Sequence, residues 1–203
     1  MNNRQIETPA VETGDVIGRV SLDDTFAAQK LERHLDGILD SVRSQRIVIV
    51  CVGTDRSTGD AFGPIIGSRL CHNLLIPNVD VLGTLDEPVH AVNLSATLDK
   101  IETIYSERPF IIAIDACLGK FDHVGQIAIE RGPLRPGAGV KKVLPEFGDL
   151  TITGIVNVSG FMEYFVLQNT RLGIVMRMSD IVAQALSSSL QTWQRSTAMR
   201  VGM

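Results

Sequence analysis

Two aspartates stand out because each closely follows a segment that is predicted to be a buried strand. Asp60 ends the loop after the apolar run Ile47–Val52, and Asp115 directly follows the apolar run Phe110–Ile114. Ligands of open α/β sheets bind at the carboxyl ends of the strands. If the two strands are neighbours, the two carboxyl groups share one cleft and cannot both ionise easily. One can then hold a proton as general acid while the other activates a water molecule as general base.

Each aspartate also has a structural interpretation. Asp60 precedes a predicted helix, where an Asp often caps the first turn, and for Asp60 taken alone capping is the stronger interpretation. Asp115 ends a wholly apolar strand, where a carboxylate faces a desolvation cost unless something uses it. The pair therefore points to an acid–base site, and both interpretations stay open at the level of sequence.

Other polar residues fall near the same predicted edge of the sheet and are candidates for binding substrate. Asp55 lies in the loop that follows the first apolar run, and Asp86 and His90 follow the predicted strand Val79–Gly83. Asp86 can equally belong to the acidic start of a helix, which the helix dipole favours.

A loop rich in glycine and proline, from Gly132 to about Gly148, carries basic residues. Its functional interpretation is a segment that lines the cleft and contacts a peptide backbone or a carboxylate. The alternative is an ordinary solvated loop. The candidate binding residues in this loop are Arg135, Gly137, Gly139 and Lys141.

Apolar runs alternate with segments of helical periodicity along most of the chain. Strands are expected at residues 47–52, 79–83, 110–114, 124–130 and 150–156, and helices at 26–44, from 61, and at 89–105, 160–168 and 172–194. This alternation predicts an α/β fold with a mostly parallel sheet that is covered on both faces. The polar residues 1–21 are expected to form a flexible N-terminal arm, and residues 22–203 a single α/β domain.

Composition narrows the function classes. The 203 residues carry a net charge of −4 without a block of Lys and Arg, which argues against a nucleic-acid surface. The chain shows no signal peptide and no apolar stretch of membrane-spanning length, so the cytoplasm is the expected compartment. Its three cysteines form no CxxC pair. The absence of a GxGxxG motif and of a GxSxG elbow disfavours dinucleotide enzymes and serine hydrolases.

Three ordered motifs resemble the germination protease of spore-forming bacteria. They are Val52–Asp55 together with Gly59–Pro64, then Ala113–Ala116, and then Arg135–Lys142. The chain is most similar to a shorter, sporulation-associated group within that family. The resemblance implies a three-layer α/β/α sandwich of the phosphorylase/hydrolase type, which the family shares with hydrogenase maturation proteases.

The resemblance also implies an activity. In the germination protease two aspartates are the proposed catalytic pair, and by motif they fall on Asp60 and Asp115. That enzyme degrades the small acid-soluble proteins that coat spore DNA, so a small protein substrate in the spore or forespore is expected. No direct contact with nucleic acid or membrane is expected, and a homo-oligomer stays possible.

Two alternatives accompany this expectation. Germination proteases are longer than this chain, so a non-catalytic sporulation protein that binds a partner through the retained fold is one alternative. The other is a metal-dependent protease of the hydrogenase maturation type, which binds nickel through equivalent acidic positions and a histidine. The last histidine here is His123, and residues 134–203 contain none, so no metal and no other cofactor is expected.

Overall fold

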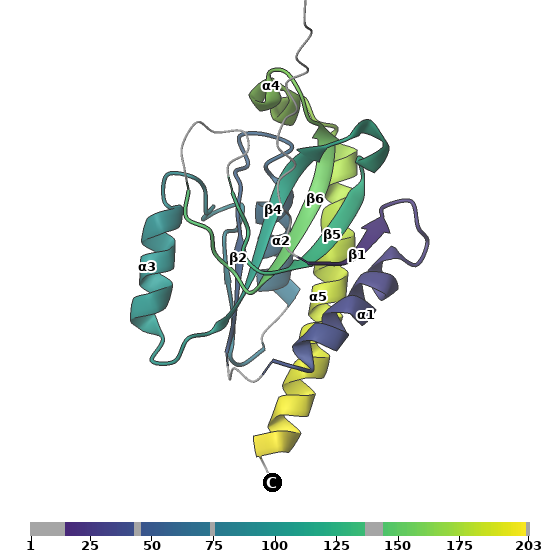
Figure 1. Cartoon of the computed structure of the whole chain (residues 1–203). Coiled ribbons are helices and arrows are strands. Elements are labelled where there is room, and N and C mark those ends of the chain that lie inside the picture. Colours follow the sequence, from purple (N-terminus) through teal and green to yellow (C-terminus); the bar gives the residue numbers. More distant parts are fainter. Residues whose placement is uncertain (1–14, 43–45, 74–75, 137–143, 202–203) are drawn as a thin grey trace, which may run out of the picture.

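The fold is built on one six-stranded sheet, with the strand order β1-β5-β6-β4-β2-β3 (Figure 1). The computed structural model describes residues 15–42, 46–73, 76–136 and 144–201. The strands are β1 Val16–Ser21, β2 Ile47–Cys51, β3 Val79–Leu82, β4 Phe110–Gly119, β5 Gln126–Arg131 and β6 Leu150–Val158. The helices are α1 Ala27–Leu39, α2 Phe62–Asn73, α3 Leu94–Ile104, α4 Glu163–Gln168 and α5 Leu172–Val201, with a short 3-10 turn η1 at Phe121–His123.

The sheet is mostly parallel, as the sequence predicts. β2 pairs in parallel with β3 and with β4, and β4 pairs in parallel with β6. β5 is antiparallel to both of its neighbours, β6 and β1, so among the described strands it alone runs in the opposite direction. The parallel strands β2 and β4 therefore end at the same edge of the sheet.

Helices cover both faces of the sheet, which confirms the predicted three-layer α/β/α arrangement. On one face, α1, α2 and α5 pack over the larger core, to which the sheet contributes Ile49, Ile112 and Ile152. On the other face, α3 and residues of the 132–149 segment cover a smaller core that includes Val48 and Val50. Figure 1 shows α1 alongside α5, well away from α3. All five residues of β2 are buried because this strand lies between the two helical layers.

The first strand corrects the expectation of a flexible arm for residues 16–21. These residues pair antiparallel with β5, and residues 1–14 lie outside the described part of the chain. Of the six residues only Val20 is buried, because β1 is an edge strand with one neighbour and one covered face. Gly18 lets the strand lie close to α1, since a Cβ there would overlap the ring of His34. Such a strand lacks the clear apolar run or alternation from which the buried strands were predicted.

Several other boundaries differ from the predicted ones. α3 begins only at Leu94, because Val89 is still extended and forms a bridge to Val52. β4 continues beyond Ile114 to Gly119, because β6 pairs with it as far as Val158. Within the described residues, no helix combines the length and apolar character needed to cross a membrane.

Candidate active site

Asp60 is held by a tight connection between β2 and α2. Gly53 has φ 142°, a conformation that residues with a side chain rarely adopt, and a Cβ there would overlap the carbonyl oxygen of Asp60. That oxygen accepts a hydrogen bond of 3.1 Å from the backbone N–H of Thr54. On the other side, a Cβ at Gly63 would overlap the carbonyl oxygen of Val52. The two glycines thus allow the loop to fold back on the strand and fix the position of Asp60.

The same loop is also attached to α4. The backbone N–H of Gly59 donates a hydrogen bond of 2.9 Å to the carbonyl oxygen of Leu167. α4 is tied to β6, because Asn157 Nδ2 donates to the Val166 carbonyl at 3.3 Å and to Thr170 Oγ1 at 3.2 Å. The backbone around Asp60 is therefore anchored to β2 on one side and, through α4, to β6 on the other.

Asp115 lies inside β4, between β2 and β6. Ile114 pairs with Cys51, and its carbonyl oxygen accepts a hydrogen bond of 2.7 Å from Val52 N–H. Asp115 pairs with Thr153 of β6. Since Ile112 and Ile114 pack into the larger core and strand residues alternate between faces, Asp115 lies on the face that carries α3. It thus lies where β2 ends, at the edge that holds Asp60.

The two carboxyl groups are close enough to affect each other's ionisation. Burial and, next, the charge of Asp60 raise the pKa of Asp115 to about 8, and the hydrogen bond from Ala116 N–H to Asp115 Oδ1 (2.8 Å) lowers it in part. Burial also raises the pKa of Asp60, and the nearby Ser57 hydroxyl offsets part of this rise. At neutral pH Asp115 is therefore mostly protonated.

The structure argues against helix capping as the role of Asp60. α2 begins at Phe62, and among the described residues no backbone N–H donates a hydrogen bond to the Asp60 side chain. Ser57 Oγ is also buried, and its hydroxyl acts on the neighbouring Asp60 carboxyl. A carboxyl group and a buried hydroxyl thus lie side by side at the carboxyl edge of the sheet.

We expect Asp115→Asn to stabilise the protein more at pH 8 than at pH 5. The pKa of Asp115 is about 8 in the folded state against a reference value of 3.8, so between these values the folded state binds more protons than the unfolded state. The free energy of unfolding therefore falls as pH rises through this window, and Asn abolishes the effect. Thermal denaturation across this range should show a gain of several degrees at the alkaline end.

The matched control is Asp99→Asn, which changes an exposed aspartate on α3. Its melting temperature should follow that of the wild type at each pH. A stability difference between Asp115→Asn and wild type that does not change with pH would contradict the raised pKa.

Asp55 and Asp86, both predicted as substrate-binding residues, are exposed at this edge. Asp55 lies in the loop that carries Asp60, and its Oδ1 accepts a hydrogen bond of 3.4 Å from Thr54 Oγ1. Asp86 lies in a turn closed by a hydrogen bond of 3.1 Å from Thr84 N–H to the Glu87 carbonyl. This turn ends well before α3 begins, so the interpretation of Asp86 as part of a helix's acidic first turn is wrong.

His90 is brought to the same edge by the residue that precedes it. The Val89 carbonyl accepts a hydrogen bond of 2.8 Å from Gly53 N–H, which places His90 next to the start of the Asp60 loop. The ring is partly engaged locally, because His90 Nδ1 lies 3.3 Å from Val92 N–H. His90 is therefore placed at the rim of the site, and its substrate-binding role stays a prediction.

The glycine-rich loop is described only at its two ends. Arg135 Nε lies 3.1 Å from Glu146 Oε1, and Leu134 and Phe147 form a short antiparallel bridge. The loop returns to the sheet at Asp149, whose N–H donates to the Ile111 carbonyl at 2.8 Å. The predicted binding residues Gly137, Gly139 and Lys141 lie outside the described residues, so their role stays a prediction.

Cys117 lies on the same strand face as Asp115 and does not supply a nucleophile. Burial and the charge of Asp115 raise the pKa of the thiol to about 12, so it stays protonated at neutral pH. Thr153 was not predicted from the sequence, yet it pairs with Asp115 and its hydroxyl interacts with Cys117. Only the strand register could have identified it.

Metal ligands do not gather at this site in the described part of the chain. No group of three or more His, Cys, Asp or Glu side chains within it is arranged to hold a metal ion.

The chain matches a sequence family and is similar to known proteins. The sequence model of the family described as "Protein of unknown function (DUF1256)" matches residues 19–185. "Uncharacterized protein YyaC" of Bacillus subtilis (strain 168) is 50% identical over 177 residues, which cover 87% of this chain and 85% of that protein.

Two solved structures show a weaker similarity. A [NiFe] hydrogenase maturation protease, HycI from Thermococcus kodakarensis KOD1, matches with a TM-score of 0.47 and 17% identity, over 76% of this chain and 99% of that chain. The E. coli hydrogenase maturating endopeptidase HybD matches with a TM-score of 0.43 and 19% identity, over 71% and 94% of the respective chains. At these TM-scores neither similarity supports a statement about the activity of this chain.

Proposed function

We propose, from the geometry of its site, that this chain is an endopeptidase that cleaves a small protein substrate by means of Asp60 and Asp115. The chain belongs to the family described as protein of unknown function (DUF1256), whose description names no activity. One observation carries the proposal. The two carboxyl groups are electrostatically coupled at the carboxyl edge of β2 and β4, and the pKa of Asp115 is raised to about 8. A carboxyl pair that keeps one proton at neutral pH is the arrangement that acid–base hydrolysis requires.

The proposed mechanism gives each aspartate one role. Asp60, ionised, accepts a proton from a water molecule as the water oxygen bonds to the carbonyl carbon of the scissile amide. Asp115, protonated, donates a hydrogen bond to the substrate and then gives its proton to the amide nitrogen as the carbon–nitrogen bond breaks. The products are a carboxylic acid and an amine, and proton exchange returns the pair to its starting state.

The proposed substrate class follows from the motifs that resemble the germination protease. These motifs cover the Asp60 loop, the Asp115 strand and the glycine-rich loop, and they support small acid-soluble spore proteins as the first substrates to test. The corresponding compartment is the cytoplasm of the spore or forespore. Asp55, Asp86, His90 and Arg135 are proposed to contact the peptide around the scissile bond.

The test is cleavage of purified small acid-soluble spore proteins by the full-length protein between about pH 5 and pH 9. We expect cleavage that slows above about pH 8, because Asp115 then loses the proton that the leaving amine needs. The rate should also fall on the acidic side, where Asp60 becomes protonated. Product masses would give the cleavage sites, and casein would serve as an unrelated substrate.

The outcomes separate the proposal from its alternatives. A cleavage rate that keeps rising beyond about pH 9 would contradict the role of protonated Asp115 as the general acid. No cleavage at any pH, together with a stable complex that survives both Asp60→Asn and Asp115→Asn, would replace the peptidase with a binding protein.

A further inference from the structure

Exposed apolar side chains gather around α4, which Figure 1 shows beyond the end of β6. Thirteen large apolar residues are exposed in the described part of the chain, and six of them fall between residues 161 and 176. Four of the six belong to α4 or directly precede it, namely Phe161, Met162, Tyr164 and Phe165. Exposed apolar residues of soluble proteins are normally scattered singly, so this concentration marks a contact surface.

A fifth side chain, Phe121, extends this surface from η1. The Ser159 N–H donates a hydrogen bond of 2.8 Å to the Gly119 carbonyl, so the segments that leave β4 and β6 start side by side. Phe121 follows this pair by two residues on one segment, and Phe161 follows it by two residues on the other. Their exposed fractions are 86% and 90%. The surface, called the α4 patch below, consists of Phe121, Phe161, Met162, Tyr164 and Phe165.

The α4 patch is held in place by the body of the protein. The rings of Tyr164 and Phe165 pack edge to face, with their centroids 5.8 Å apart. The backbone of α4 accepts hydrogen bonds from Asn157 of β6 and from Gly59 in the loop that carries Asp60. The helix is therefore fixed to the sheet and to this loop. Because little ordering is needed when such a surface meets a partner, the patch is suited to a stable contact.

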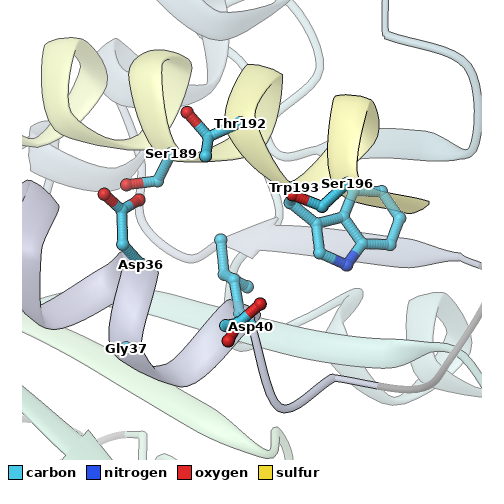
Figure 2. A pocket seen from close by; sticks show the side chains of 8 residues that line it. Asp36, Gly37, Asp40, Ser189, Thr192, Trp193 and Ser196 are labelled. Atoms are coloured by element: carbon cyan, nitrogen blue, oxygen red, sulfur yellow. The ribbon is translucent and has the colours of Figure 1, made fainter. Parts of the chain in front are cut away.

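The pocket between α1 and α5 offers no comparable surface. Its volume is about 260 Å³, and Figure 2 shows the side chains of the two helices that line it. This volume is below the about 300–1,000 Å³ of typical ligand sites. A protein partner is therefore expected at the α4 patch and not at this pocket.

The size and chemistry of the α4 patch indicate its partner. Its five side chains together expose roughly 700 Å². The largest apolar patch of a typical monomer measures about 300–600 Å², and each partner of a standard interface contributes about 800 Å². Aromatic and Met side chains are also the ones in which the cores of protein interfaces are enriched. A substrate would cover this surface only during a turnover, whereas a second copy of the chain covers it permanently.

The charges beside the patch favour self-association. They comprise two cations and two anions, which are Lys120, Arg171, Asp122 and Glu163. In a two-fold symmetric contact, cations of one copy face anions of the other, and the two surfaces carry no net charge that would repel. We propose that two copies of this chain form a symmetric dimer through the α4 patch.

The mass of the full-length protein in solution tests the proposal. Sedimentation velocity between about 1 and 100 µM should show a dimer that dissociates on dilution. A reducing agent is included because Cys71 is exposed. The melting temperature should rise with protein concentration, since a dimer that forms only from folded chains stabilises them. A monomer at every concentration would overturn the proposal and leave the patch to a different protein. Species that keep growing beyond the dimer would overturn the symmetric contact.

Variants assign the contact to the patch. Phe161→Ser combined with Phe165→Ser should raise the dissociation constant of the dimer by at least about a hundredfold, because buried aromatic side chains dominate interface energies. The matched control is Val92→Ser combined with Ile104→Ser, which removes two exposed apolar side chains just before α3 and at its end. This control should dimerise as the wild type does.

Circular dichroism establishes that both double variants are folded. A dimer that survives the Phe161→Ser and Phe165→Ser pair would overturn the assignment of the contact to the α4 patch. Equal loss of the dimer in the control pair would overturn it as well. Because mass and not cleavage is measured, the outcome does not depend on the proposed activity.

Discussion

Asp60→Asn and Asp115→Asn should each lower the rate of spore-protein cleavage by about 10²–10⁴-fold without unfolding the protein. Asparagine matches aspartate in size but can neither accept nor release a proton at neutral pH. The first variant loses the base that activates water, and the second loses the acid that protonates the leaving amine. Asp115→Asn also removes the group that holds the raised pKa, so the alkaline fall in rate should vanish from its residual activity.

Rates should be measured under single-turnover conditions, so that binding and the chemical step are separated. Asp99→Asn is again the matched control, since it removes one exposed carboxylate from a helix on another part of the surface. Thermal melts of all three variants establish that they are folded. If either active-site variant cleaves within about threefold of the wild-type rate, the two-aspartate mechanism is wrong.

Gly53→Ala should destabilise the protein by about 3 kcal/mol, one of the larger costs expected for a single methyl group. The residue has φ 142°, and an added Cβ would overlap the backbone carbonyl oxygen of Asp60, which cannot rotate away. Either the β2–α2 connection shifts, or the close approach of residue 53 to the Asp60 carbonyl is lost. In both cases Asp60 moves relative to Asp115, so activity should fall even at temperatures where the variant is folded.

Gly173→Ala is the matched control for this substitution. It lies in the first turn of α5, where an added Cβ meets nothing within 4 Å, so it should leave the melting temperature unchanged or slightly raised. Differential scanning calorimetry of both variants measures the contrast. A Gly53→Ala melting temperature within about one degree of wild type would show that the loop has room to adapt.

The sequence predicted those parts of the fold that depend on local pattern. The run Ile47–Val52 is apolar at every position, and β2 is buried on both faces as that run predicts. Asp60 and Asp115 could be proposed as neighbours because each follows such a run, and the carboxyl ends of adjacent parallel strands meet at one edge. The motifs that resemble the germination protease pointed to the same pair.

The sequence did not predict features that depend on pairing between distant segments. β1 carries a weak apolar pattern, and only its ladder with β5, more than a hundred residues later, makes it a strand. β4 extends past Ile114 because β6 supplies a partner there. The helix predicted from residue 89 starts at Leu94 because the bridge to Val52 keeps Val89 extended.

The amino-acid sequence by itself predicted the fold class, the buried strands and the two aspartates as candidate site residues. Periodicity and apolar runs predict the fold class and the strands because they reflect which residues of each short segment are buried. The tertiary structure alone decided that Asp115 is buried beside Asp60, which raises its pKa to about 8. It also decided that Asp36 and Trp193 line one pocket, although their helices lie near opposite ends of the chain. The ionisation of a carboxyl and the exposure of an indole depend on neighbours that only folding brings together.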